Sequence, residues 1–312
     1  MKTVFEVFAG MACNDDWQVA GRRKGASRRI KHLKTDSRQV SECQVDKQRT
    51  INAMNELRGE DFWLQWRDVL SEHLLSSASV SSKKNEDVYL KHCVCYGLGN
   101  FASCISARYQ LAMLLLLLET LQIPAGSCCV YDPAFSVSEC NALRELGFNV
   151  LTENEVEIHT CAVVKRNWNF VISFKWSLYT HQEGKRAVSQ PTLFYLMHCG
   201  KALYNNLLWK NWSPQTLPNI VIIGNSFHGI QERMLQREFE RDYSFLSYVI
   251  RVCEETSLAC SQRFLDVFND TALVQFPPEN LNRLGDCTWT ETSEPLYQHC
   301  KDLEIILREK HC

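Results

Sequence analysis

The sequence predicts an α/β fold: a doubly wound, mostly parallel, Rossmann-like sheet with helices on both faces and an N-terminal helical extension. From residue 88 onward, short apolar runs rich in β-branched and aromatic residues alternate with helical patterns, as in parallel sheets covered on both faces. Glycine, aspartate and asparagine follow several of these runs, where strand-to-helix turns are expected. The chain has 312 residues, of which 45% are hydrophobic and 22% charged, so it is long and apolar enough to bury a large core.

Three segments precede this domain. The stretch 21–34, GRRKGASRRIKHLK, carries seven Lys or Arg and no acid, so we predict that residues 1–44 are mostly a disordered basic arm. Such an arm is either a solvated tail or a signal for nuclear import or nucleic-acid binding. Apolar residues at near-helical spacing, broken at Gly59, predict a helical extension of two helices over residues 45–80. The polar linker SSASVSSKKNED then leads into an α/β domain at residues 88–312.

Six strands are predicted in the domain, because each is a short apolar run bounded by turn residues. They are residues 92–96, 127–131, 149–152, 192–197, 220–223 and 272–276. Helices are predicted at residues 103–121, 136–146, 201–209 and 230–254. Ser136 and Glu139 form a capping box at the start of the second of these helices, and Gly147 has the place of its left-handed end. Residues 157–182 are longer and more aromatic than a crossover needs, so we predict an insertion there, either an edge hairpin or an irregular excursion.

The residues that follow the predicted strands form the candidate site, because an open parallel sheet binds ligands outside the carboxyl ends of its strands. Glycines allow close approach of the backbone, helix N-termini supply free N–H groups, and an acid after the second strand can accept hydrogen bonds from ribose. If the crevice outside the carboxyl ends of the strands binds a cofactor, these features favour a nucleotide or S-adenosylmethionine. The candidate residues are Gly97, Gly99, Asn100, Asp132, His198, Asn225 and Ser226.

The dinucleotide pattern is incomplete. The glycines read GxGxxA, and Asp132 follows Gly97 by 35 residues where the pattern expects about 20. The alternative that these glycines and Asp132 only form strand-to-helix turns, and bind no ligand, is therefore open. If the first and fourth strands are neighbours, we expect the loops after them to diverge and Gly97, Gly99, Asp132, His198 and Asn225 to line one pocket.

The cysteines and histidines do not predict a metal site. The 15 cysteines include no CxxC pair and indicate reduced thiols of the cytosol or nucleus. Neighbours on a strand point to opposite faces, so adjacent His and Cys cannot share an ion, and we expect no metal ligands and no direct haem ligation. The net charge of −2 and the absence of a membrane-length apolar run predict neither nucleic-acid nor membrane binding by the domain. The sequence has no P-loop, GxSxG or HExxH motif, so it nominates no residues for hydrolytic chemistry. The adjacent His and Cys that we expect not to share an ion are His92-Cys93, His198-Cys199, His299-Cys300 and His311-Cys312.

Five separated segments carry a family resemblance: CVCYGLGNFASCISARYQLAMLLLLLE, VYDPAFS, PTLFYLMHCGKALYNNLLWKNWS, IVIIGNSF and FNDTALVQFP. Through them the chain resembles the sensitivity-to-red-light-reduced, or SRR-like, family, and within it the animal members with an SRR domain. The resemblance spans roughly residues 90–308 and is loose over the first 80. It is interrupted by the predicted insertion, which separates ENE at 153–155 from EGKR at 183–186. The residues that match the family pattern are Gly97, Gly99, Asp132, His198, Asn205, Asn206, Asn225 and Asp270, and the family assigns none of them a catalytic role.

The resemblance implies a regulatory protein. Plant members act in phytochrome signalling and the circadian clock, and animal members are linked to haem biosynthesis and to expression of core clock genes. We therefore expect a non-enzymatic or weakly enzymatic regulator of these two processes, in the cytoplasm or also the nucleus, that works with protein partners and has no established cofactor. One alternative is a methyltransferase-like enzyme that uses a nucleotide or S-adenosylmethionine in the strand-end crevice. Another is an interaction module without a ligand.

Overall fold

The computed structural model describes residues 28–75, 90–151, 184–291, 293–298 and 300, with side chains from residue 42 onward. The chain divides into two compact units, Met1–Gln39 and Val40–Cys312, and the second contains the sheet. The predicted insertion at 157–182, the linker at 76–87 and the first part of the basic arm lie outside the described residues.

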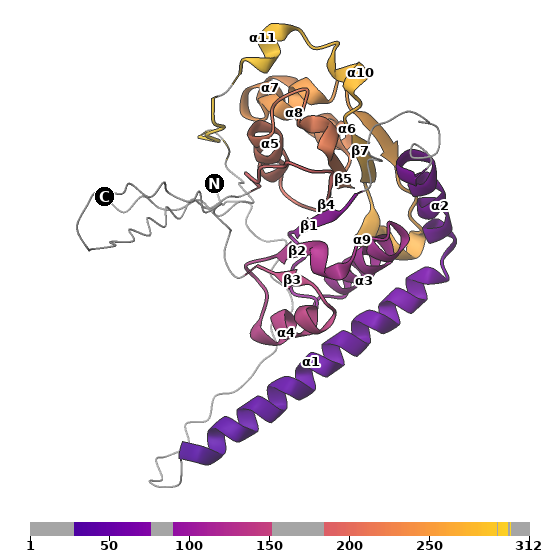
Figure 1. The fold of residues 1–312 in the computed structure, drawn as a ribbon, viewed down its shortest axis with the longest axis vertical. Coiled ribbons are helices and arrows are strands. Elements are labelled where there is room, and N and C mark those ends of the chain that lie inside the picture. The colour runs from indigo at the N-terminus through magenta and orange to yellow at the C-terminus, as the bar shows by residue number, and fades with distance from the viewer. Residues whose placement is uncertain (1–27, 76–89, 152–183, 292, 299, 301–312) are drawn as a thin grey trace, which may run out of the picture. The chain divides into compact units, whose positions relative to one another are not determined.

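The sheet has seven strands in the order β3-β2-β1-β4-β5-β7-β6. β1 to β5 are parallel to one another, whereas β7 runs antiparallel to both of its neighbours. The predicted fold class, a doubly wound and mostly parallel α/β sheet, is thus confirmed (Figure 1). The strands are β1 His92–Tyr96, β2 Cys128–Tyr131, β3 Asn149–Val150, β4 Thr192–Leu196, β5 Ile220–Asn225, β6 Glu254–Ser257 and β7 Thr271–Gln275.

Helices cover both faces of the sheet: α2, α3, α4, α9 and residues 43–57 of α1 lie on one face, and α5 to α8 lie on the other (Figure 1). The longer helices are α1 Arg28–Arg58, α2 Asp61–Leu70, α3 Ile105–Thr120, α4 Val137–Glu145, α5 Lys201–Lys210, α6 Phe227–Glu232, α7 Gln236–Asp242 and α8 Ser244–Val249. The short helical segments are η1 Ser71–Leu75, η3 Ala125–Ser127, η4 Leu217–Asn219, η5 Gln262–Phe264, α9 Leu265–Phe268, α10 Pro278–Leu281 and α11 Asp286–Trp289.

The strands supply two hydrophobic cores, one on each face. Cys93 and Cys95 of β1 pack into the core under α3, and their neighbours Val94 and Tyr96 pack into the core under α5. This alternation follows from the two-residue period of a strand, and it explains why the strands read as continuous apolar runs. Burial raises the pKa of the Cys93 and Cys95 thiols, so these cysteines serve as small core residues.

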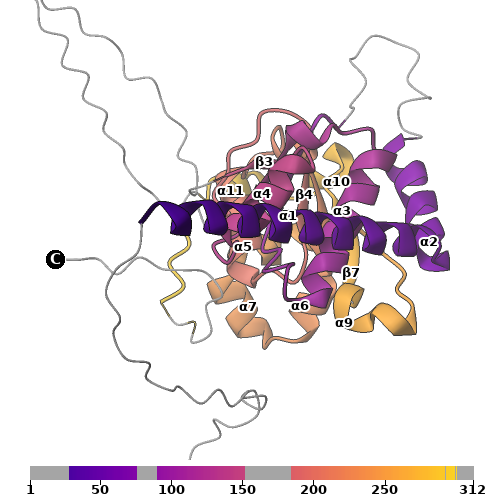
Figure 2. The same ribbon diagram turned by 90° about the horizontal axis from the view of Figure 1, so that it is seen from below.

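α3 is apolar on nearly all sides because it is covered on nearly all sides. Its residues from Leu111 to Leu118 are buried except for Leu115, which packs partly against the same core. One side lies on the sheet, and the other is covered by α1, α2 and α9 (Figure 2). Among the described residues, no helix is both long and apolar enough to cross a membrane.

The C-terminal part of α1 lies across α4 and α3 (Figure 2). At α4, the Gln44 amide donates to Glu145 Oε2 at 2.8 Å. At α3, the Tyr109 hydroxyl donates to Glu56, and Arg58 pairs with Glu119 at 2.6 Å. These contacts fix residues 44–58 of α1 on the outside of α3 and α4.

Two expectations about helices were wrong. α1 begins at Arg28, so the segment 28–44, which we had placed in a disordered arm, is helical. No glycine or proline interrupts it after Gly25, and helix-favouring Lys, Arg and Gln are frequent there. The predicted helix at 230–254 is instead three short helices and β6, because Leu235 and Tyr243 have non-helical backbone angles. The pairing of β6 with β7 depends on residues distant in sequence, which a local pattern does not contain.

Candidate functional site

The parallel strands place the predicted site residues along one edge of the sheet, and β1 and β4 are neighbours, as expected. The space between the loops that follow them is filled by the Cys199 thiol. Its Sγ donates to the Tyr96 carbonyl oxygen at 3.3 Å and lies 2.6 Å from where a Cβ on Gly97 would stand. The two loops are therefore in contact at this point.

Gly97 and Gly99 have φ angles of 69° and 75°, in the left-handed region that favours glycine. The turn they make brings the Gly99 N–H to Asp132 at the end of β2. Asp132 Oδ2 accepts a hydrogen bond from Gly99 N at 2.7 Å, and Oδ1 accepts one from Ala134 N at 2.7 Å. Both carboxylate oxygens thus hold backbone N–H groups of adjoining loops, the arrangement that turn chemistry requires.

We expect Asp132→Ala to lower the free energy of unfolding by about 2 kcal/mol, because two backbone N–H groups lose a charged acceptor in a half-buried turn. Asp132→Asn keeps one acceptor oxygen and should lose about half as much. Urea denaturation followed by circular dichroism measures both. If the alanine variant is as stable as the natural protein, the Asp132 carboxylate is not needed for the turn, and its role as a ligand acceptor would be favoured again.

His198 and Asn225 form a second linked pair. The Asn225 side chain accepts from His198 N at 2.9 Å through Oδ1 and donates to the Cys199 carbonyl at 3.2 Å through Nδ2. His198 has a φ of 51°, and its Nε2 lies 2.9 Å from the Val267 carbonyl oxygen. Asn225 therefore holds the irregular loop after β4 in place.

Ser226 is the N-cap of α6. Its Oγ accepts from Gly229 N at 2.8 Å and donates to Glu255 Oε1 at 2.5 Å. Glu255 Oε2 in turn accepts from Phe227 N at 2.8 Å, so an acid of β6 completes the cap. Sequence reasoning missed Glu255 because it missed β6.

The predicted residues thus lie on one edge but bond in separate groups. Gly97, Gly99 and Asp132 belong to the loops after β1 and β2, and Asn225 links to His198 and Cys199 after β4. Their convergence in a single ligand pocket stays a prediction.

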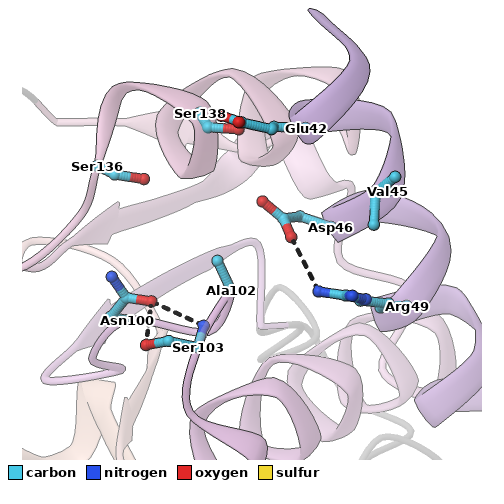
Figure 3. Close-up of a pocket in the computed structure, with 9 residues that line it drawn as sticks. All are labelled: Glu42, Val45, Asp46, Arg49, Asn100, Ala102, Ser103, Ser136 and Ser138. Atoms are coloured by element: carbon cyan, nitrogen blue, oxygen red, sulfur yellow. Dashed lines mark hydrogen bonds and ion pairs between the residues drawn. The ribbon is translucent and has the colours of Figure 1, made fainter. Parts of the chain in front are cut away.

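A cavity of about 440 Å³ opens next to the first group, between α1, the loop after β1 and the start of α4 (Figure 3). Of the predicted site residues, Asn100 is the one that lines it. Sequence reasoning missed the α1 wall, because residues 1–44 were placed in an arm and the helix after it was assigned only a packing role. The lining residues are Glu42, Val45, Asp46, Arg49, Asn100, Ala102, Ser103, Ser136 and Ser138.

Asp46 is the most buried charge on this wall, with 6% of its surface exposed. Its carboxylate points into the cavity and accepts no hydrogen bond from a described residue, and Arg49 Nη1 is 3.9 Å away (Figure 3). Burial raises the pKa of Asp46, Glu139 and Glu42 add to the rise, and Arg49 and Arg108 oppose it.

Glu139 does not line the cavity, but its carboxylate joins the two loops that do. The predicted capping box is confirmed, with Glu139 Oε2 accepting from Ser136 N at 2.8 Å. Glu139 Oε1 also accepts from Ala102 N at 2.9 Å, a long-range bond that the local pattern does not reveal. This carboxylate is fully buried and holds the loop after β1 against α4.

We expect Asp46→Asn to raise the free energy of unfolding at pH 7 by about 1 kcal/mol relative to the natural protein. The pKa of Asp46 is higher in the folded than in the unfolded state, so ionisation destabilises the fold as pH rises from the unfolded pKa through the folded one. Below both pKa values the difference should vanish. Urea titrations at several pH values test this, with exposed Asp68→Asn as the control. A less stable Asp46→Asn at pH 7 would mean that Arg49 stabilises the carboxylate.

Within the described part of the chain, no group of three or more His, Cys, Asp or Glu side chains is arranged to hold a metal ion.

The chain is 46% identical to the SRR1-like protein of Mus musculus over 176 residues, which are 56% of this chain and 59% of the mouse protein. It is 29% identical to the SRR1-like protein of Drosophila melanogaster over 300 residues, 93% of this chain and 91% of that protein. It is 30% identical to Protein SENSITIVITY TO RED LIGHT REDUCED 1 of Arabidopsis thaliana over 141 residues, 45% of this chain and 42% of that protein.

The matches therefore span less than two thirds of the mouse and Arabidopsis relatives. No solved structure matches the chain. The model of the SRR1 domain matches residues 67–275, which include β1 to β7 and all the predicted site residues. The chain therefore belongs to the SRR1 family.

Proposed function

We propose that this chain is a regulatory protein that influences haem biosynthesis and the expression of core circadian clock genes. The observation that carries the proposal is the SRR1 domain over residues 67–275, together with the resemblance to animal SRR-like proteins set out above. The geometry of the strand-end residues is consistent with a regulator, because their polar groups bond mainly to one another.

Depletion of the protein from cells of its source tests this proposal. We expect a change in cellular haem and a reduced amplitude of clock-gene transcript rhythms, both restored by the natural chain. The variant Gly224→Ala, expected below to unfold readily, should not restore them and serves as the control. Normal haem and normal rhythms after depletion would refute the proposal.

We further propose that the protein acts in the cytoplasm, and also the nucleus, through protein partners. The basic composition of residues 21–34 supports the nuclear location. Replacing its seven Lys and Arg by Gln should reduce the nuclear fraction seen by imaging. Chemical cross-linking in cells tests for partners, and a chain recovered only uncross-linked would argue for action without them.

A second candidate is an S-adenosylmethionine-dependent, methyltransferase-like enzyme, and the sheet favours it. The order β3-β2-β1-β4-β5 is that of nucleotide-binding doubly wound folds. This is an analogy of fold, which does not by itself assign a function. Asp132, the expected ribose acceptor, already accepts one hydrogen bond on each oxygen, from Gly99 N and Ala134 N.

Thermal unfolding with S-adenosylmethionine, S-adenosylhomocysteine, adenine nucleotides and nicotinamide nucleotides tests the second candidate. A ligand at 100 times its dissociation constant should stabilise the fold by about 2.7 kcal/mol. Unchanged midpoints at millimolar ligand would leave the regulatory proposal as the one to pursue.

A further inference from the structure

We propose that a second cavity, between residues 186–190 and the amino ends of β2, β1 and β4, binds a small oxyanion, the carboxylate or phosphate group of a small molecule. The proposal does not depend on the regulatory or the enzymatic function above. It rests on a guanidinium group without a described carboxylate partner, on the charge of the cavity lining, and on the contacts that hold the guanidinium in place.

The cavity lies on the face of the sheet that α5 covers, at the end of the strands opposite to the candidate site. His92 and Thr192 are the first residues of β1 and β4, and Ser127 directly precedes β2, so the amino ends of three neighbouring strands line it. Val94 lines it as well and belongs to the core under α5. None of the predicted strand-end residues is in this lining, so the cavity is a separate site.

Arg186 supplies the charge of the cavity. It is half-buried, its Nη2 donates to the Cys129 thiol at 3.8 Å, and the Tyr96 hydroxyl accepts a further hydrogen bond. Burial acts to lower the pKa of Arg186, but these two contacts raise it by more, so the guanidinium stays charged. Among the described residues, no Asp or Glu pairs with Arg186 or shifts its pKa.

The partners of Arg186 are therefore neutral groups. A cation that is partly removed from water is normally accompanied by an anion, because neutral acceptors replace only part of its lost hydration. A thiol is also a weak acceptor. An oxyanion in the cavity would supply the missing negative charge and could accept two parallel N–H bonds from the guanidinium, the geometry in which arginine pairs with carboxylate and phosphate.

The charge around the cavity does not oppose an anion. Its lining contains Arg186 and His92 and no Asp or Glu. Lys185 is next to Arg186 in sequence, but its Nζ pairs with Glu294 at 2.5 Å, so the two charges compensate each other outside the lining. Asp132, at the far end of β2, is also outside the lining and accepts a backbone hydrogen bond on each oxygen.

The fold holds the segment that carries Arg186 in a fixed position. Asn211 is buried, donates through Nδ2 to the Arg186 carbonyl oxygen at 2.8 Å, and accepts from Val188 N at 2.8 Å through Oδ1. Gly184 lies so close to α5 that a Cβ there would stand 2.5 Å from the Leu203 carbonyl oxygen. Arg186 is therefore positioned before a ligand arrives, which reduces the entropy lost on binding.

Neutral donors give the anion further contacts. His92 Nε2 lies 3.0 Å from Gln190 Oε1, which leaves the Gln190 amide nitrogen as a donor without a described partner. The hydroxyl groups of Ser127 and Ser189 belong to lining residues as well. The volume of about 240 Å³ is smaller than the roughly 300–1,000 Å³ of sites for drug-sized ligands. We therefore expect a ligand with few non-hydrogen atoms besides its anionic group.

Three small probes test the charge. Acetate and acetamide have nearly the same shape, but only acetate is charged, and methyl phosphate presents the other oxyanion. Saturation-transfer NMR that observes the methyl group of each probe should detect saturable binding of acetate or methyl phosphate to the full chain, weakened by salt, and no binding of acetamide. The anion that binds more tightly identifies the class of ligand. Equal signals from acetate and acetamide, or no saturable binding of either anion up to about 10 mM, would overturn the proposal.

Variants of Arg186 test the place. Arg186→Gln should weaken anion binding at least tenfold, because it removes the charge and the paired donors. Arg186→Lys keeps the charge without the paired N–H groups and should bind with intermediate affinity. Arg67→Gln on α2 makes the same chemical change as the first variant at an exposed position outside the lining, and should bind like the natural chain. Thermal unfolding confirms that each variant is folded at the temperature used. Unchanged binding by folded Arg186→Gln would show that the anion binds elsewhere and would refute the site.

Discussion

Gly224→Ala should lower the free energy of unfolding by about 3 kcal/mol or more, a large share of the 5–15 kcal/mol that a folded domain has. A Cβ at Gly224 of β5 would lie 2.6 Å from the Tyr204 hydroxyl oxygen and 2.7 Å from the Leu196 carbonyl oxygen. The hydroxyl can move at the expense of its hydrogen bonds, but the carbonyl belongs to the neighbouring strand β4. The substitution must therefore separate β4 from β5. Chemical denaturation followed by tryptophan fluorescence measures the loss.

The matched control is Gly126→Ala. A Cβ there would meet the Gly147 carbonyl oxygen at 3.8 Å, an ordinary contact, so its effect should stay below about 1 kcal/mol. Equal effects of the two substitutions would show that the close approach at Gly224 is not what makes glycine necessary.

A double variant separates the two contacts at Gly224. The Tyr204 hydroxyl donates to Leu196 O at 2.5 Å and accepts from Asn225 N at 2.9 Å, so it bridges the ends of β4 and β5 beside the candidate site. Tyr204→Phe alone should destabilise, because it leaves the Asn225 N–H without this acceptor. The double variant with Gly224→Ala should lose less free energy of unfolding than the two single variants together, because removal of the Tyr204 hydroxyl gives the alanine methyl more room. If the losses of the two single variants simply add, the methyl group at position 224 does not press against the Tyr204 hydroxyl.

The parts of the fold that the sequence predicted correctly are those with local signals. α4 is an example: its capping box of Ser136 and Glu139 and the left-handed Gly147, at φ 94°, lie within twelve residues of one another. The apolar runs likewise predicted β1, β4 and β5, because buried parallel strands are continuous in sequence. β6 was missed because its sequence, EETS, is polar, and only its pairing with β7 makes it a strand.

The candidate site was predicted in part for the same reason. Glycine after β1 and aspartate after β2 are local features of turns, and both are found in turns. What these residues bond to is not local: Gly99 N donates to Asp132 and Ala102 N to Glu139. The cavity beside them needs Asp46 from α1, and no residue spacing indicates that α1 lies over the loop after β1.

A second substitution with a large expected effect on stability, at Trp66, tests where the α/β domain begins. We predicted that the α/β domain begins at residue 88 and that residues 45–80 form an extension; this division is untested. Trp66 of α2 bears directly on it, because it is fully buried in the same core as β1 and α3. Its ring contacts Phe268 at a centroid distance of 5.8 Å, and its Nε1–H donates to the Ala259 carbonyl oxygen at 2.6 Å. α2 is thus packed against α9 and against the segment that precedes it.

Trp66→Ala should therefore lower the free energy of unfolding by about 3–5 kcal/mol, because it leaves a large cavity in the core and an unpaired carbonyl. Trp66→Phe keeps most of the ring contact and loses mainly the hydrogen bond, so about 1–2 kcal/mol is expected. A single cooperative urea transition that shifts with both variants would show that α2 unfolds together with the sheet. If residues 45–80 are a separable extension, Trp66→Ala will leave the main transition in place and a chain that begins at residue 88 will fold. The burial of Trp66 argues for the opposite result, in which that shortened chain loses one wall of its core and does not fold.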